Sequence, residues 1–361
     1  LETEPVNDSP PGDVAPPPTS GDVQILQVGQ GVGASARFWE VYFTAPTGST
    51  DPATYNDGID APLADAIDAV RSTLDIAAFE WNNPTIHAAV LRAHERGVQV
   101  RMAVDSEHTH LDEAESEIRA LRNAGIEIAP DDRSGLMHNK FMIMDGQTVW
   151  TGSTNFTVNG VYRNNNNLLM LRSRRAVEAF QAEFNEMFTG REFGSSRSEV
   201  NSAYFNQDGV EVQVVFSPED DVLNNMRQVI SLAEESVRFM TFSFTLDEIG
   251  EVLLEEAQEG IDIQGIFEVR GSETEFSEMP RLLCAGVDVR QDGNSFTFHH
   301  KVFIIDDEIV MTGSFNISNN ATERNDENQV IISDPDLAAQ YIAEFERRWA
   351  EARVPDGIEC D

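Results

Sequence analysis

Lysine is almost missing from this chain. Lys140 and Lys301 are the only two lysines among 361 residues, and 25 lysines and arginines together face 63 acidic residues, for a formal net charge of -38. Such a charge repels polyanions at long range, although salt shortens that reach to about 8 Å at physiological ionic strength. A high-salt habitat and plain compositional drift both explain an acidic surface. Neither explains where the two lysines lie.

Cysteines and long apolar runs are also scarce. Cys284 and Cys360 are the only cysteines, too few for a disulfide framework or a zinc ligand set. Two alternatives stay open: one bridge tying the C-terminal tail to the second half of an exported protein, or one buried and one loose thiol. No run of about 18 apolar residues occurs, so the sequence predicts no membrane-spanning helix.

The beginning of the chain has almost no apolar content. Residues 1–21 are rich in Pro, Asp, Glu, Ser and Thr, a composition that cannot bury enough surface to fold. We expect a disordered tether left after removal of a signal or lipoprotein leader, and therefore a secreted or extracytoplasmic protein. An arbitrary start of the chain would look the same.

An internal repeat organises the rest of the chain. His138-Asn139-Lys140 returns 161 positions later as His299-His300-Lys301, and four residues and an Asp follow each lysine. The run Thr-Gly-Ser-x-Asn then follows in both copies. Both lysines of the protein therefore occupy the same place in a repeated motif.

Each half shows the same alternation of short apolar strands and amphipathic helices. Strands are expected at residues 40–44, 98–105 and 148–152 and again at 212–217, 261–269 and 309–313. Helices are expected at residues 61–72, 111–124, 174–188, 222–233 and 335–352. The pattern predicts an α/β fold with two similar α/β/α sandwich halves, each a mixed sheet flanked by helices. We expect the halves at residues 22–200 and 201–353, with a tail at 354–361.

The repeated motif offers an imidazole beside an ammonium group in each half. Side chains two apart on a strand point to one face, so His138 should project with Lys140, and His299 with Lys301. One such motif is weak evidence for a site. Two copies in register, each with the same downstream residues, indicate shared chemistry.

These residues resemble the paired H-x-K-x4-D motifs and downstream G-S-x-N of the phospholipase D superfamily, over about residues 38–350. The resemblance implies a pseudo-twofold axis at which both motifs meet. It implies one catalytic pocket lined by His138, Lys140, Asn155, His299, Lys301 and Asn316. Ser153 and Ser314 should lie at its edge. Asp145 and Asp306 are expected to be structural supports.

Phosphodiester cleavage without a metal needs a nucleophile, a proton donor and compensation for negative charge. Two histidines can divide the first two tasks. The two lysines and the asparagine amides supply the donors that a metal would otherwise supply. We therefore expect a metal-independent phosphodiesterase that forms a phosphohistidine, has no cofactor or metal ligands, and works in the presence of a chelator.

An asymmetry distinguishes the two histidines. The residue 28 positions after each one is Asn166 in the first half and Glu327 in the second, where the family places a group that orients an imidazole. Only Glu327 can stabilise an imidazolium by charge. By analogy with the family, His138 is expected to be the nucleophile and His299 the general acid and base. Which histidine Glu327 contacts stays open.

The other histidines and the aromatic residues near the motifs have structural explanations. His108 and His110 have metal-like spacing, but nothing completes a ligand set, so a solvated loop is predicted. His300 should face the opposite side of its strand from the motif residues. The aromatic residues near two strand ends could border a cleft, although core packing is the default for Phe79, Trp81, Phe242 and Phe244.

Three functions compete. A lipid-cleaving enzyme, with peripheral membrane contact, tolerates an acidic surface. A nuclease is less expected, because nucleic-acid binding uses many basic contacts and no lysine lies outside the motifs, although Arg172, Arg174 and Arg175 form a small cluster. A non-catalytic binding protein would be expected to lose a motif residue, and both motifs are intact. One chain holds both halves, so a monomer suffices.

Overall fold

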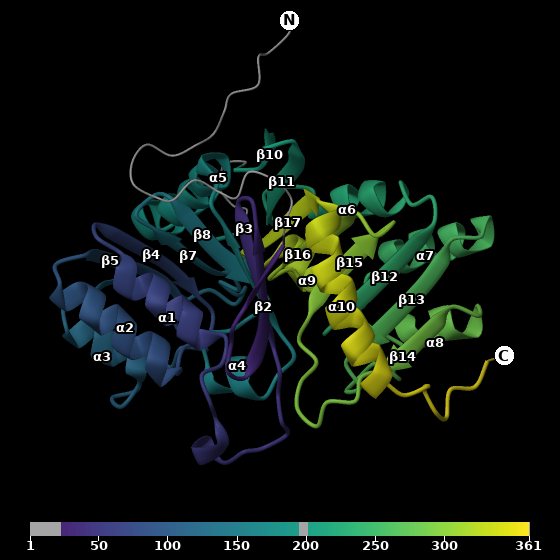
Figure 1. Ribbon diagram of the computed structural model, residues 1–361, viewed down its shortest axis with the longest axis horizontal. Helices are drawn as coiled ribbons and strands as arrows, with labels where there is room; N and C mark the ends of the chain where they lie inside the picture. The colour runs from purple at the N-terminus through teal and green to yellow at the C-terminus, as the bar shows by residue number, and fades with distance from the viewer. Residues whose placement is uncertain (1–22, 195–200, 361) are drawn as a thin grey trace, which may run out of the picture.

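The chain folds into two mixed β-sheets, one in each half (Figure 1). The computed structural model describes residues 23–194 and 201–360. The predicted tether at residues 1–21 therefore lies outside the described residues, as does part of the predicted boundary near residue 200. The sheets of the described chain are built from residues 24–171 and 203–333.

The two sheets repeat one strand order, to which the first sheet adds β1 at its edge. The first runs β1-β2-β3-β9-β8-β7-β4-β5-β6, and the second runs β10-β11-β17-β16-β15-β12-β13-β14. The first sheet contains β1 (Gln24–Leu26), β2 (Gly31–Ala36), β3 (Trp39–Thr44), β4 (Thr73–Ala78), β5 (Gln99–Asp105), β6 (Glu127–Asp131), β7 (Lys140–Met144), β8 (Thr148–Gly152) and β9 (Asn167–Leu171). The second contains β10 (Ala203–Gln207), β11 (Val210–Ser217), β12 (Ser236–Thr241), β13 (Asp262–Phe267), β14 (Asp288–Gln291), β15 (Lys301–Ile305), β16 (Ile309–Gly313) and β17 (Glu327–Ser333). The predicted fold of two similar α/β halves is confirmed.

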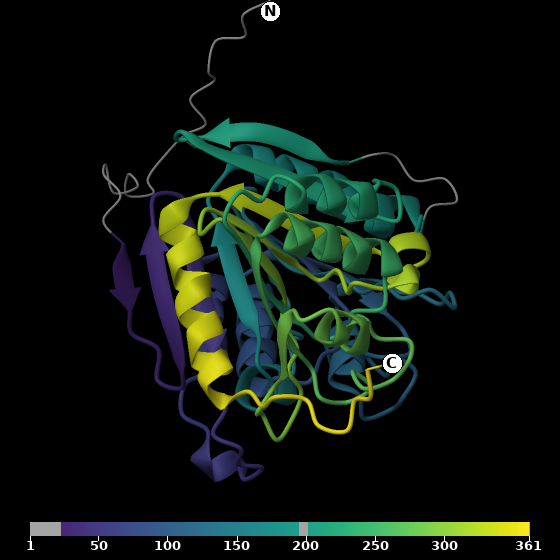
Figure 2. The ribbon, with the colours of Figure 1, turned by 90° about the vertical axis from the view of Figure 1, so that its right-hand side faces the viewer.

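Helices cover the outer face of each sheet and fill the space between the sheets. An apolar cluster joins the first sheet to α1 (Asp60–Ala69), α2 (Pro84–Glu95) and α3 (Glu117–Asn123). A second cluster joins the other sheet to α6 (Val222–Ile230), α7 (Asp247–Glu259) and α8 (Glu278–Cys284). Between the sheets lie α5 (Arg174–Asn185), which contacts β8 and β11, and α10 (Pro335–Glu351), which contacts β3 and β16 (Figures 1 and 2). The largest core is therefore shared by both halves.

Local sequence sets where these helices begin and end. Asn83 accepts a hydrogen bond from the Ile86 amide at the start of α2, and Ser173 does the same for the Ala176 amide at the start of α5. Gly97 and Gly260 follow α2 and α7 with φ of 89° and 98°, a left-handed conformation that glycine adopts without a Cβ clash. Short elements complete the chain: η1 (Pro52–Thr54), α4 (Val158–Tyr162), the π-helical turn η2 (Glu186–Gly190) and α9 (Asn319–Glu323).

Two local expectations were wrong. The helix expected at residues 111–124 begins only at Glu117, because the Ser116 hydroxyl caps it and also donates to the Thr109 carbonyl, which holds the preceding residues in turns. The motif histidines precede β7 and β15 instead of lying on them. Their backbone amides donate to the other half, His138 to the Asp326 carbonyl at 3.0 Å and His299 to the Asn165 carbonyl at 2.9 Å.

The C-terminal tail is tied to the second half. Cys284, at the end of α8, forms a disulfide bond with Cys360. Of the two alternatives left open for the cysteines, the structure contains the bridge. In the described parts of the chain, no helix combines the length and apolar character needed to cross a membrane.

Candidate active site

The two motif segments meet where the halves join. The His138 segment pairs with residues before β17, and the His299 segment pairs with residues before β9, through isolated bridges between Met137 and Asp326 and between Asn165 and Phe298. The backbone of each half thus fixes the position of the other half's histidine. Both histidines are buried, with 5% and 7% of their surface exposed.

Glu327 orients the histidine of the opposite half. Its Oε2 atom accepts a hydrogen bond from His138 Nδ1 at 2.7 Å. The carboxylate assigns the hydrogen to Nδ1, because a carboxylate can only accept. Nε2 of His138 is then the nitrogen left for chemistry. The open question of which histidine Glu327 contacts is answered: the partner is His138.

Asn166 is the counterpart behind His299. Its Oδ1 atom lies 2.9 Å from His299 Nδ1, and the Ser153 carbonyl lies 3.0 Å from the same nitrogen. Both groups accept, so this imidazole also carries its hydrogen on Nδ1 and leaves Nε2 without a partner in the described chain. The two histidines therefore differ in their backing: a carboxylate for His138, a neutral amide for His299.

The two serines lie behind the orienting residues and not at the edge of the pocket, where they were expected. Both are fully buried. Ser314 Oγ donates to Glu327 Oε2 at 2.7 Å, and Ser153 Oγ donates to Asn166 Oδ1 at 2.8 Å. Each serine also accepts from a backbone amide of the same half. The serine hydroxyls therefore fix Glu327 and Asn166, which in turn orient the imidazoles.

Each motif lysine lies against an aromatic ring. Lys140 Nζ is 4.8 Å from the centre of the Phe79 ring, and Lys301 Nζ is 5.0 Å from that of Phe242. Each ammonium also donates to the carbonyl of the histidine in its own motif, at 2.6 and 3.1 Å. Phe79 and Phe242 contact the imidazoles as well. Core packing was the wrong expectation for these two residues and the right one for Trp81 and Phe244.

Burial dominates the electrostatics of the site. It lowers the pKa of His138 to about 4 and that of Lys140 to about 8, although Glu327 opposes both changes. The pKa values of His299 and Lys301 are also lowered well below their usual values by burial, and then by the neighbouring lysines. Interactions with His138 and Lys140 keep the pKa of Glu327 low despite its burial. Near neutral pH both imidazoles are therefore neutral.

The asparagines of the two motifs are not equivalent. Asn155 Nδ2 donates to Glu80 Oε2 at 2.5 Å. The negative charge of Glu80 also raises the pKa of Lys140, against the effect of burial. The Oδ1 atoms of Asn155 and Asn316 both lack a hydrogen-bond partner within the described chain. Residue 80 corresponds to Ser243 in the second half. The sequence analysis missed Glu80. A comparison of the two halves could have found it, because one copy of the repeat has a carboxylate where the other has a serine.

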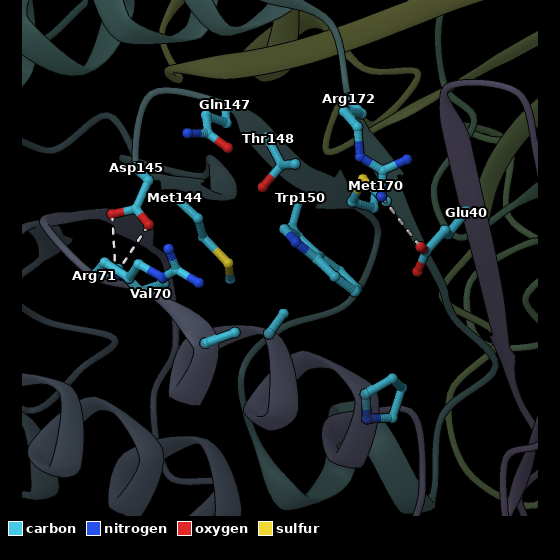
Figure 3. A pocket seen from close by; sticks show the side chains of 13 residues that line it. Glu40, Val70, Arg71, Met144, Asp145, Gln147, Thr148, Trp150, Met170 and Arg172 are labelled. Atoms are coloured by element: carbon cyan, nitrogen blue, oxygen red, sulfur yellow. Dashed lines mark hydrogen bonds and ion pairs between the residues drawn. The ribbon is translucent and has the colours of Figure 1, made fainter. Parts of the chain in front are cut away.

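The aspartates that close the motifs lie away from the histidines. Asp145 accepts hydrogen bonds from the amides of Arg71, Ser72 and Thr73. Its carboxylate points at this turn from the rim of a separate cavity of about 330 Å³ (Figure 3). Asp306 accepts three backbone amides in the same way at the start of β12. Both carboxylates join a strand end to a turn.

His108 and His110 lie in a loop, as predicted, and His110 is exposed, but the His108 ring packs beside the site. Its ring centre is 4.3 Å from that of Phe79, whose other contacts are His138 and Lys140. Asp105 Oδ1 lies 2.9 Å from His108 Nδ1 and accepts the backbone amide of His108 at the same distance. No periodicity marked this residue, because the loop that carries it has no regular structure.

The remaining histidine of the motifs faces away from the site, as expected. His300 is buried between the sheets, 3.2 Å from Glu344 and 3.3 Å from Asn167. Within residues 23–194 and 201–360, no group of three or more His, Cys, Asp or Glu side chains is placed to hold a metal ion. Metal independence stays a prediction.

Comparison with known proteins decides the family. The model of the family described as "Cardiolipin synthase, PLD-like domain" matches residues 63–188 and, separately, residues 226–349. The chain belongs to the phospholipase D superfamily. The resemblance drawn from the paired motifs is confirmed, and each match covers one half of this phospholipase D-like chain.

Relatives and a solved structure agree with this assignment. A mitochondrial cardiolipin hydrolase of Xenopus tropicalis is 32% identical over 41% of this chain and 75% of its own length. A phospholipase D of Rickettsia bellii is 32% identical over 38% of this chain and 63% of its own. The fold is shared with the phosphatidylserine synthase of Haemophilus influenzae at a TM-score of 0.64 and 12% identity, over 83% of this chain and 86% of that one. The chain spans about half to three quarters of the cardiolipin hydrolases it matches.

Proposed function

We propose that this protein, by its family a phosphoric diester hydrolase of the phospholipase D type, hydrolyses phospholipid phosphodiesters through a phosphohistidine. The pair of buried imidazoles carries the proposal. Each has Nδ1 held by groups of the other half, and among the described residues each leaves Nε2 without a partner beside two lysines. That arrangement offers a nucleophile, a proton carrier and two positive charges.

In the first step His138 Nε2 attacks phosphorus, and the bond from phosphorus to the leaving oxygen breaks. Glu327 supports the positive charge that grows on this imidazole. His299, which takes up a second proton on Nε2 from solvent as the phosphate binds, gives this proton to the leaving oxygen. Its neutral partner Asn166 suits this role, because an imidazolium without a carboxylate releases its proton more readily. Burial is the main cause that keeps His299 neutral, and substrate phosphate beside Lys140 and Lys301 offsets the positive charges that add to it.

In the second step His299 takes a proton from water, and the water oxygen attacks phosphorus. The bond from phosphorus to nitrogen breaks, which returns His138 to its neutral form with both electrons of that bond. The two lysines stabilise the phosphoryl oxygens in both steps. Asn155 and Asn316 remain proposed donors to the phosphate, and Asn155 keeps a second amide hydrogen besides the one it gives to Glu80.

Charge and kinship favour lipid over nucleic acid as the substrate. The relatives include a cardiolipin hydrolase and a phospholipase D. The net charge of -38 opposes the approach of a polyanion. The small arginine cluster is already engaged, because Arg172 lies 3.7 Å from Glu40, while Arg174 and Arg175 lie within 4.0 Å of Glu178. The nuclease remains the second candidate.

The disulfide bond supports the proposed secreted or extracytoplasmic location. Structural disulfides persist in oxidising compartments and are rare in the cytosol. A complete pair of motifs within one chain supports the proposed monomer, because both imidazoles and both orienting groups come from the same molecule.

The test incubates the protein in excess EDTA with phosphatidylcholine vesicles and, separately, with single-stranded DNA. His138→Ala and His299→Ala are compared with the wild type, and exposed His110→Ala serves as the matched control. We expect choline release from the wild type and His110→Ala, and none from the two active-site variants. DNA cleavage without lipid turnover would establish the nuclease instead. No hydrolysis of either substrate would favour a non-catalytic binding protein, and loss of activity in EDTA would overturn metal independence.

A further inference from the structure

We propose that His108 is a specificity-determining residue that contacts the substituent retained on phosphorus after the first step. The inference rests on the proposed phosphodiesterase function. It adds a third imidazole to the active site, on the side of His138. The contact would favour substrates whose retained group carries polar oxygens close to phosphorus, as a glycerol ester does.

The Phe79 ring connects His108 to the reacting groups. Ring centres of Phe79 and His108 are 4.3 Å apart with planes inclined by 31°, and those of Phe79 and His138 are 4.6 Å apart with planes inclined by 66°. The two imidazoles are therefore separated by no more than the sum of these distances. These distances place His108 close enough to contact a substituent of a phosphodiester held at His138.

Asp105 fixes the His108 ring. The carboxylate accepts both the backbone amide and Nδ1 of His108 at 2.9 Å, and only 3% of Asp105 is exposed. Nδ1 therefore carries the hydrogen, and Nε2 is left without a partner in the described chain. The side chain is about one third exposed. An oriented, accessible nitrogen beside a catalytic pocket is a ready hydrogen-bonding group for a ligand.

The second half lacks this feature. The two residues lost from the second half fall in the loop that corresponds to the one carrying His108, and residues 268–277 contain no histidine. The third imidazole therefore stands only on the His138 side. When His138 attacks phosphorus, the leaving oxygen departs toward His299, on the opposite side of an in-line displacement. A group beside His138 is placed to contact what remains on phosphorus.

The test compares His108→Ala with wild type on three soluble substrates. Dibutyrylglyceryl p-nitrophenyl phosphate and methyl p-nitrophenyl phosphate share a leaving group and differ in the retained group. Dibutyryl phosphatidylcholine keeps the first retained group with another leaving group. We expect kcat/KM to fall about tenfold for both dibutyrylglyceryl substrates, as for one lost hydrogen bond, and less than about twofold for the methyl substrate.

Two variants separate contact from structure. His108→Gln keeps a hydrogen-bonding group near the position of Nε2 and should recover part of the loss. His110→Ala, two residues along the same loop, removes an imidazole that pairs with exposed Glu113 and should leave kcat/KM unchanged. An equal loss on the methyl substrate, a loss that varies with the leaving group, or no loss would overturn the inference alone. A wild type that hydrolyses none of the three substrates would overturn the proposed function.

Discussion

The two catalytic imidazoles have different hydrogen-bond partners on Nδ1, and each partner comes from the opposite half. Glu327, from the second half, holds His138 of the first, while Asn166 of the first half holds His299 of the second. The same carboxylate is held by Ser314. A substitution at Glu327 should therefore act on the chemistry of a histidine 189 positions away in the sequence.

Glu327→Gln should lower kcat by one to two powers of ten with little change in KM, because a charged hydrogen bond that strengthens in the transition state is worth about 1.5 to 3 kcal/mol. The measurement is steady-state hydrolysis of phosphatidylcholine. Ser314→Ala, which removes a hydroxyl from the same carboxylate but keeps its charge, should cost less. An equal loss in both variants would contradict a role for the charge.

The pH dependence of kcat/KM follows from the buried groups. Attack needs neutral His138, whose pKa is lowered to about 4, and phosphate binding needs protonated Lys140, whose pKa is lowered to about 8. The profile should therefore fall below about 4, and on the alkaline side it should already decline below pH 6.5, because the acid of the first step is protonated His299, whose pKa burial lowers well below its usual value. Unfolded His138 would titrate at 6.5, so the unfolded chain gains its proton first and stability also declines as pH falls from that value toward 4. Circular dichroism at each pH separates the two effects, and an acid limb near 6.5 in folded protein would contradict the assignment.

Single residues also show where sequence reasoning ends. The repeat placed both His-x-Lys pairs, Asn166 and Glu327 correctly in register, because identical spacing survives in both halves. It could not pair Glu327 with His138, since that contact depends on how the halves pack. The sequence analysis did not identify Glu80 and His108 as site residues, because each occurs in one half only. A search for self-similarity has no second copy with which to compare them.

Strands and turns are joined by the aspartates that close each motif. Asp306 receives the amides of Glu234, Glu235 and Ser236 and thereby holds the start of β12 against the end of β15. These bonds lower the pKa of Asp306 although burial opposes them. The stability they provide is present above the unfolded pKa of 3.8 and is lost as pH falls through the lower, folded value.

Asp306→Ala should destabilise the fold by about 1 to 3 kcal/mol, because three amides lose their acceptor but remain partly open to water. Urea unfolding monitored by fluorescence measures the change. Neighbouring Glu308→Ala, an exposed carboxylate, should be neutral. Activity of folded Asp306→Ala should stay near the wild-type level, and a large fall in kcat at unchanged stability would instead show a catalytic role.

Longer elements were predictable because their apolar periodicity is strong. The expected helix at residues 335–352 agrees with α10 within one residue, and the expected strand at 148–152 is β8. The edge strands β6 and β14 were missed because they contain few apolar residues. The start of α3 was misplaced because the cap at Ser116 and the turns before it depend on side-chain hydrogen bonds that composition does not reveal.

The protein as a whole is one folding unit in its core and in its active site. The largest apolar cluster contains Phe141 and Phe180 of the first half together with Phe216 and Tyr341 of the second. Thr151 and Asn328 also bond across the boundary at 2.7 Å. Family knowledge implied that the motifs meet, but the shared core shows why neither half should be stable alone: separation would expose its largest apolar surface.

The acidic surface makes stability depend on salt. With a net charge of -38, repulsion between carboxylates favours the unfolded chain, and salt screens it within about 3 Å at 1 M. The urea midpoint should therefore rise between about 0.05 and 1 M salt. Sodium and potassium chloride should act alike if screening is the cause. A midpoint that stays constant or falls would contradict this account.

The covalent intermediate tests the central claim most directly. Wild-type protein is mixed with phosphatidylcholine, quenched in alkali within one turnover, digested and analysed by mass spectrometry. We predict a phosphoryl-containing adduct on His138, with accumulation in His299→Ala if the first step still proceeds with an activated p-nitrophenyl substrate. An adduct on His299, or a burst of product without any histidine adduct, would contradict the mechanism derived from this site.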